Sequence, residues 1–186
     1  VQHRNRTGQG QFVDVAMLDG LIPFNAMDGA GFLVDGGEPV REGGRLNGGS
    51  LYDFYETADG GYLSVGSLEP KFWAAFCQTI GCPELIEGGP EPQDLDQVKA
   101  KVRAILKSKT RDQWTALFQQ TDACVEPVLS VDQALNHDPQ IQAREMVVEV
   151  PLPAPYGPGR TVRQLGSPIK LSQCPAEYRH AGYPLG

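Results

Sequence analysis

The sequence predicts an α+β fold in which a β-hairpin, several helices and short antiparallel strands form a small domain. Aromatic and β-branched residues fill the runs 51–57 and 62–66, and Ala58-Asp59-Gly60-Gly61 between them favours a tight turn. Apolar residues at helical spacing follow in the runs 70–80, 95–106 and 110–118. A hairpin followed by helices of this kind defines the class.

The residues before the hairpin predict a strand, a helix and a long loop. Polar and apolar residues alternate in 11–15, which is typical of a short strand. Apolar residues from Met17 to Ile22 take helical spacing, and Pro23 predicts a kink. Glycine and charged residues dominate 28–49, so we expect a linker or a mobile functional loop there.

The first helix after the hairpin begins at Pro70, because proline suits the first position of a helix. Gly81 predicts its end. We expect its buried stripe to consist of Phe72, Trp73, Phe76, Cys77 and Ile80. The second helix repeats apolar residues at helical spacing, at Leu95, Val98, Val102, Ile105 and Leu106.

A capping box of Thr110 and Gln113 predicts the start of the third helix. Residues 124–129 predict an extended segment at a sheet edge, because Pro127 lacks a ladder donor. The remaining chain predicts short helices capped at Ser130 and opened by Asp138-Pro139, the second reaching Met146. Strands at 147–150 and 161–165 are expected on either side of a proline-rich connector, 151–159.

Composition narrows the class of function. The 186 residues carry a net charge of −7, which argues against binding to nucleic acid. No apolar run approaches the ~20 residues that cross a bilayer, so no membrane partner is expected. The four cysteines lack metal-ligand spacing, and Cys77 and Cys82 lie among apolar or small residues. Reduced, partly buried thiols and a cytoplasmic location fit this pattern.

Glu69 is the main candidate for chemistry, since it stands between the hairpin and the helix that Pro70 opens. A carboxylate at such a corner can face a cleft and act as a base. The helix dipole and the free N–H groups favour a negative charge there. The same position equally suits a glutamate that only satisfies the helix end, and residue spacing leaves both interpretations open.

Other candidate residues give weaker signals. The glycine loop at Asn47, Gly48 and Gly49 would let the backbone approach a ligand, but no Gly-Lys-Ser/Thr follows to make a phosphate loop. Turn formation is the alternative reading of these glycines. The histidines lie far apart, and no Ser/His/Asp or Cys/His set stands out.

Several motifs in order resemble the family III CoA-transferases, and within them the α-methylacyl-CoA racemase branch. The branch rests on the runs Leu68-Glu69-Pro70-Lys71-Phe72 and 122–129. The motifs are Gly8–Gly20, Asn47–Tyr52, Tyr55–Gly66, Leu68–Phe72, Thr121–Leu129, Asp138-Pro139, Arg144–Met146 and Gly166–Pro168.

The resemblance implies racemisation of 2-methylacyl-CoA thioesters, with Glu69 as the base on one face of the α-carbon. The opposite face would be served by a His/Asp pair of a Rossmann-like large domain that precedes Val1. Transfer of CoA between carboxylic acids by an Asp nucleophile is the alternative. Acyl-CoA would be the substrate without a further cofactor, with Asn47, Gly48, Gly49 and Tyr52 as candidate substrate-binding residues.

The resemblance also implies the organisation of the chain. The chain starts without Met and ends without a closing element, so we expect a C-terminal piece of a longer polypeptide, inactive by itself. Residues 1–35 would end the large domain and connect it, residues 36–150 would form the small α+β domain, and residues 151–186 would return towards the large domain. The whole protein would form an interlocked homodimer.

Overall fold

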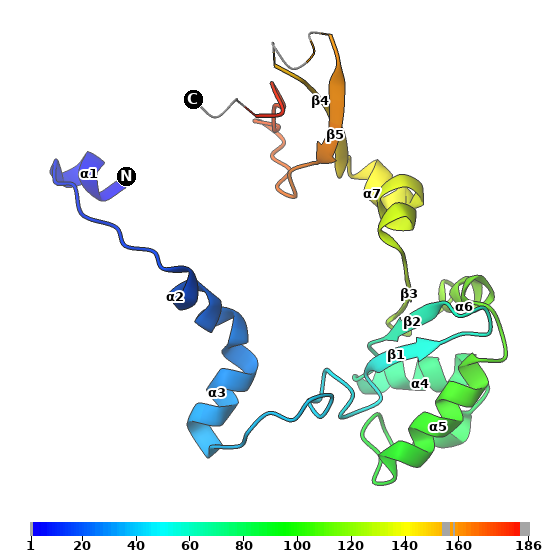
Figure 1. The fold of residues 1–186 in the computed structure, drawn as a ribbon. Coiled ribbons are helices and arrows are strands. Elements are labelled where there is room, and N and C mark those ends of the chain that lie inside the picture. Colours follow the sequence, from blue (N-terminus) through cyan, green and yellow to red (C-terminus); the bar gives the residue numbers. More distant parts are fainter. Residues whose placement is uncertain (1, 154–156, 158, 183–186) are drawn as a thin grey trace. The chain divides into compact units, whose positions relative to one another are not determined.

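The computed structural model describes residues 2–153, 157 and 159–182, and it divides into two compact units, residues 1–126 and 127–186 (Figure 1). The predicted α+β class is confirmed, since helices accompany short antiparallel strands. The predicted domain boundaries, after residues 35 and 150, stay predictions. The predicted connector 151–159 lies partly outside the described residues. Among the described residues, no helix has the length and apolar content to cross a bilayer.

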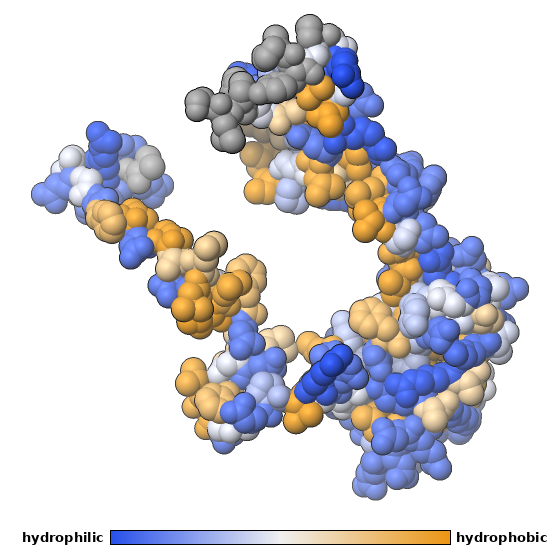
Figure 2. Space-filling view, viewed as in Figure 1, coloured by the Kyte–Doolittle hydropathy of each residue, from blue (hydrophilic) through white to orange (hydrophobic). Residues whose placement is uncertain are grey.

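The first unit begins with helices that contain no buried residue. They are α1 (Gln2–Thr7), α2 (Met17–Leu21), the 3₁₀ turn η1 (Ile22–Asn25) and α3 (Ala26–Asp35). Pro23 lies in η1, the 3₁₀ turn between α2 and α3, and the predicted kink there stays a prediction. The large apolar side chains of this segment are exposed, Phe24 by 91%. Figure 2 shows this apolar surface over the segment that Figure 1 labels α2 and α3.

Two predictions for this segment are wrong. Residues 11–15 form no strand, because a strand needs a hydrogen-bonded neighbour and no described strand pairs with them. Residues 28–35 belong to α3 rather than to a loop, and the left-handed Gly36 ends that helix. The glycines inside α3 made the sequence look like a linker, although the helix tolerates them.

The core of the first unit lies between a sheet and helices. The three-stranded sheet has the order β1-β2-β3, from β1 (Asp53–Glu56), β2 (Tyr62–Val65) and β3 (Val125–Val128). The helical elements are α4 (Pro70–Thr79), the 3₁₀ turn η2 (Pro83–Leu85), α5 (Leu95–Leu106) and α6 (Arg111–Phe118). The predicted hairpin, helices and edge strand are therefore confirmed.

Large aromatic side chains fill this core. Trp73 and Phe76 stack at 5.5 Å between ring centroids, and Phe76 stacks on Phe118 at 5.8 Å. The indole nitrogens of Trp73 and Trp114 donate to the carbonyls of Leu85 and Leu106, at 3.0 and 2.8 Å. These bonds satisfy the polar ends of the tryptophans, so both rings can be buried without an unpaired donor. The predicted capping box of Thr110 and Gln113 is present.

The second unit contains short helical turns and a hairpin. Its elements are the π-helical turn η3 (Gln133–His137), α7 (Pro139–Ala143), β4 (Val147–Pro151) and β5 (Thr161–Leu165). Strands β4 and β5 pair antiparallel, with Val148 opposite Gln164. The helix predicted to reach Met146 ends at Ala143. The chain reverses at Glu145, whose φ of +50° is left-handed and stops the helix.

Candidate functional site

Glu69 lies at the corner between β2 and α4, where the sequence placed it. It is the N-cap residue of α4, with an extended backbone at φ −77° and ψ 143°. Its side chain is exposed and makes no capping hydrogen bond. A glutamate that merely satisfied the helix end would place a carboxylate oxygen on one of the free N–H groups. The carboxylate is instead available to a ligand.

The corner before Glu69 is tied to the segment that leads into β3. The hydroxyl of Ser67 donates to the carbonyl of Ala123 at 2.5 Å, and both residues are buried. The backbone N–H of Gly66 donates to the carbonyl of Cys124 at 2.9 Å. Two bonds from successive residues therefore fix the backbone that carries the glutamate.

Tyr52 and Cys124 enclose Gly66 at the same corner. A Cβ atom on Gly66 would lie 3.3 Å from Sγ of Cys124 and 3.4 Å from Cε2 of Tyr52. Cys124 itself has a left-handed backbone, with φ +54°, which is uncommon for a residue other than glycine. The fold thus brings Tyr52 from the start of the hairpin and Cys124 from the start of β3 together beside the Glu69 corner.

One basic side chain lies near this corner. Nζ of Lys71 lies 3.6 Å from Oδ2 of Asp122, and both side chains are well exposed. The same ammonium sits 4.2 Å from the centroid of the Phe72 ring. An exposed pair of this kind contributes little to stability, so Lys71 is free to turn towards an anionic ligand at low energetic cost.

The glycine loop forms a folded turn. Gly49 N–H donates to the carbonyl of Gly44 at 2.9 Å, and a Cβ atom on Gly49 would lie 2.1 Å from the carbonyl oxygen of Gly43. Gly48 has φ +87°, and a Cβ there would meet the carbonyl oxygen of Glu42 at 2.7 Å. Both glycines are thus required by close backbone packing within the loop.

A buried lysine holds this turn from the side of α5. Lys99 is 4% exposed, and its Nζ donates to the carbonyl of Gly48 at 2.6 Å. The same ammonium lies 2.7 Å from Oδ2 of Asp53 in β1. Sequence reasoning missed Lys99, because a lysine on an amphipathic helix is ordinarily solvated.

The substrate-binding assignment of Asn47, Gly48, Gly49 and Tyr52 stays a prediction. Tyr52 reaches the Glu69 corner, and the carbonyl of Tyr52 accepts from Gly48 N–H at 3.3 Å. Asn47 is exposed and lines a separate hollow of about 510 Å³ with Met27, Asp28, Glu38, Pro39, Val40, Gly43, Gly44, Arg45 and Leu46.

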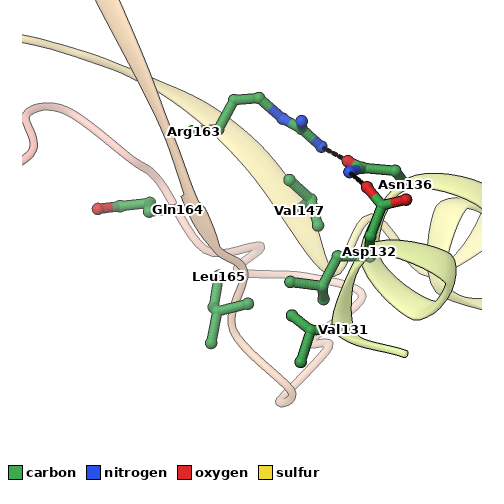
Figure 3. A pocket seen from close by; sticks show the side chains of 8 residues that line it. Val131, Asp132, Asn136, Val147, Arg163, Gln164 and Leu165 are labelled. Atoms are coloured by element: carbon green, nitrogen blue, oxygen red, sulfur yellow. Dashed lines mark hydrogen bonds between the residues drawn. The ribbon is translucent and has the colours of Figure 1, made fainter. Parts of the chain in front are cut away.

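The second unit has its own pocket of about 460 Å³, shown in Figure 3. Arg163 Nη2 donates to Asn136 Oδ1 at 2.6 Å, and Asn136 Nδ2 donates to Asp132 Oδ1 at 2.7 Å. The pocket is lined by Val131, Asp132, Leu135, Asn136, Val147, Arg163, Gln164 and Leu165. It contains none of the residues for which the sequence predicts a site.

The core cysteines are poorly suited to nucleophilic chemistry. Cys77 and Cys82 are buried and free, which confirms the prediction for their burial. Desolvation and the neighbouring Cys82 raise the pKa of the Cys77 thiol to about 12, and desolvation raises the pKa of Cys82 as well. Since the thiolate is the reactive form, these thiols stay inert near neutral pH. The described residues contain no group of His, Cys, Asp and Glu arranged to hold a metal ion.

Comparisons with known proteins agree with the motif order. The family model described as CoA-transferase family III matches residues 1–186. The α-methylacyl-CoA racemase of Mus musculus is 30% identical over 157 residues, covering 82% of this chain and 41% of the mouse protein. The succinyl-CoA:mesaconate CoA-transferase of Haloarcula marismortui is 29% identical over 180 residues, covering 93% of this chain and 43% of that protein.

A solved structure agrees with the fold. A CAIB/BAIF family protein from Brucella suis matches with a TM-score of 0.76 at 22% identity, over 99% of this chain and 47% of that chain. At this identity the likeness concerns the fold alone. The chain spans less than half the length of the curated relatives described above.

Proposed function

Because the chain belongs to CoA-transferase family III, we propose that it supplies one proton-transfer group, Glu69, to an enzyme that racemises 2-methylacyl-CoA thioesters. The names of the mouse and Haloarcula relatives describe enzymes that act on CoA thioesters. The racemase relative supports the proposed reaction, and the exposed carboxylate at the corner between β2 and α4 supports the choice of residue.

The observation that carries this proposal is the state of the Glu69 side chain. It is exposed, it makes no capping bond, and it stands on a backbone fixed by Ser67 and Gly66. A general base must be free to accept a proton and must be held in place. The exposed Glu69 carboxylate and the hydrogen-bonded backbone beneath it support this role.

The proposed step is removal of the proton α to the thioester carbonyl. The C–H bond breaks, its electron pair moves into the enolate, and the Glu69 carboxylate takes the proton. Return of a proton to the opposite face inverts the centre, so a second proton carrier is needed there. Donors that stabilise the enolate oxygen are needed too. We propose that both belong to residues preceding this chain in a longer, homodimeric, cytoplasmic protein.

The alternative is transfer of CoA between carboxylic acids. The transferase from Haloarcula marismortui matches a larger share of this chain than the mouse racemase does. In that case an Asp nucleophile outside this chain would form the covalent intermediate. Glu69 would then line the pocket without accepting the α-proton.

The test uses the protein that carries this chain together with its preceding residues, incubated with a 2-methylacyl-CoA in deuterated water. Deuterium incorporation at the α-carbon without any acceptor acid is the expected result. Glu69→Gln should lower the exchange rate at least about a hundredfold, as loss of a general base typically does. Glu126→Gln, which changes another exposed carboxylate, in β3, serves as the control and should leave the rate unchanged.

Dependence of turnover on a second carboxylic acid, without α-exchange, would instead identify a transferase. Full exchange activity in Glu69→Gln would remove this residue from the mechanism. We also expect the chain alone to show no racemisation, and measurable racemisation by it would contradict the division of the proton carriers.

A further inference from the structure

Ser67 is a buried polar residue that neither a helix nor a sheet requires. It is 3% exposed and lies outside both β2 and α4. Its hydroxyl donates to the Ala123 carbonyl at 2.5 Å. Burying a hydroxyl is costly unless it is paired, so this bond holds the two segments together.

The partner segment has an unusual shape that makes the bond possible. Ala123 is buried, and the next residue, Cys124, is left-handed at φ +54°. This backbone presents the Ala123 carbonyl to Ser67 and the Cys124 carbonyl to Gly66 N–H, at 2.5 and 2.9 Å. We call these two hydrogen bonds the corner latch.

The latch acts at the base of the segment that carries Glu69. Leu68 N–H donates to the Gly66 carbonyl at 2.9 Å, which makes a tight turn between the latch and the glutamate. The Glu69 side chain makes no capping hydrogen bond that would fix it to the helix. Its position therefore depends on the backbone, and the backbone depends on the latch.

We propose that Ser67 is a positioning residue for the proton transfer by Glu69. This inference rests on the proposed function, since it assigns Ser67 a role in the same reaction. Loss of the hydroxyl allows the corner to move away from the start of β3. A misplacement of about 1 Å at a reacting group can cost up to about a hundredfold in rate. We expect the loss of the hydroxyl to lower kcat rather than to raise KM, because the groups that bind the substrate are unchanged.

The first measurement is the rate of α-proton exchange by the protein with its preceding residues. Ser67→Ala should lower kcat about tenfold with KM changed less than about twofold, and Ser67→Thr, which keeps the hydroxyl, should recover most of it. Thr79→Val is the matched control, because Thr79 Oγ1 also donates to a backbone carbonyl, that of Ala75 at 2.7 Å, at the opposite end of α4. It should keep the wild-type kcat.

The second measurement is amide hydrogen exchange at Gly66 and Leu68 in this chain alone. Ser67→Ala should raise both exchange rates about tenfold, and Thr79→Val should leave them unchanged. Wild-type exchange rates in Ser67→Ala would show that no latch exists. Faster exchange with an unchanged kcat, beside an inactive Glu69→Gln, would overturn the positioning role and leave the proposed function standing. An active Glu69→Gln enzyme would overturn the proposed function, whatever the exchange rates at the corner.

Discussion

The ammonium of Lys99 lies 2.7 Å from the carboxylate of Asp53, and this ion pair joins helix α5 to strand β1. The lysine side chain is 6% exposed and the aspartate side chain is 24% exposed. The same ammonium also reaches the Gly48 carbonyl at 2.6 Å. One buried cation therefore connects the hairpin, a helix and the glycine turn.

Removal of this cation should destabilise the first unit. Lys99→Met leaves the Gly48 carbonyl without this donor and leaves Asp53 with the exposed Arg103, 3.5 Å away, as its ion-pair partner, so we expect a loss of about 3 kcal/mol in the free energy of unfolding. Denaturant titration followed by tryptophan fluorescence measures it, because both tryptophans lie in this core. Lys101, on the same helix as Lys99, forms an exposed pair with Glu84 in η2, so Lys101→Met should cost less than about 1 kcal/mol. Equal losses in the two variants would contradict the structural role of Lys99.

The glycine turn should reject a side chain at Gly49. A methyl group there would overlap the Gly43 carbonyl oxygen, 2.1 Å away. We expect Gly49→Ala to lower the free energy of unfolding by about 2 kcal/mol, as overpacking does. Gly44→Ala is the control in the same turn, because the nearest atom would lie 3.9 Å from its Cβ. A fully stable Gly49→Ala protein would show that the turn opens easily.

The hairpin turn should give the first unit an acid-sensitive element. The hydroxyl of Thr57 and then the N–H of Arg111 donate to the Asp59 carboxylate, at 2.6 and 3.0 Å, and lower the pKa of Asp59 below its ordinary value of 3.8. Because the pKa is lower in the folded state, the ionised carboxylate stabilises the fold at pH values above the ordinary pKa. This stabilisation is lost as the pH falls through the lowered pKa.

Asp59→Asn should therefore lower the denaturant midpoint at pH 7, and the difference from the wild type should shrink as the pH falls below 3.8. Asp14→Asn, in the irregular segment before α2, should leave the midpoint unchanged at pH 7. The contribution of the Asp59 charge should fade below pH 3.8, the ordinary pKa of the group. A difference between wild type and Asp59→Asn that stayed constant down to about pH 2.5 would therefore rule out a role for this charge.

The turn before β4 should be stabilised by glycine. The left-handed backbone of Glu145, at φ +50°, is strained by its Cβ atom, whereas glycine adopts this conformation freely. We expect Glu145→Gly to slow amide exchange in the β4–β5 hairpin about threefold to fivefold, which corresponds to about 0.6–1 kcal/mol. Arg144→Gly, at the neighbouring φ of −90°, should speed exchange instead. Faster exchange in both variants would show that the Glu145 side chain has a stabilising contact.

Local signals in the sequence predicted the parts of the fold that depend on local chemistry. The turn residues 58–61 placed the hairpin, Pro70 opened α4, and Thr110 with Gln113 opened α6. Each signal acts within one turn of chain, so a sequence displays it directly. Residues 11–15 show the opposite case, because their alternation predicts a strand whose pairing depends on a distant partner.

The site divides in the same way. Glu69 could be placed at its corner because both the hairpin and Pro70 are local signals. Ser67 and Lys99 could not be assigned, because each is defined by a partner far along the chain, Ala123 and Asp53. The left-handed backbone of Cys124 has no signal in its residue type, since glycine is the residue that ordinarily marks such a position.

Pro127 in β3 has a consequence for how the sheet can grow. Strand β3 is an edge of the three-stranded sheet, and proline has no N–H to offer a further strand. The β3 edge therefore lacks one of the donors that a strand from another molecule would need, which disfavours strand addition there. Pro127 is also the first residue of the second unit. The residue that weakens the β3 edge for strand addition is thus also the residue at which the second unit begins.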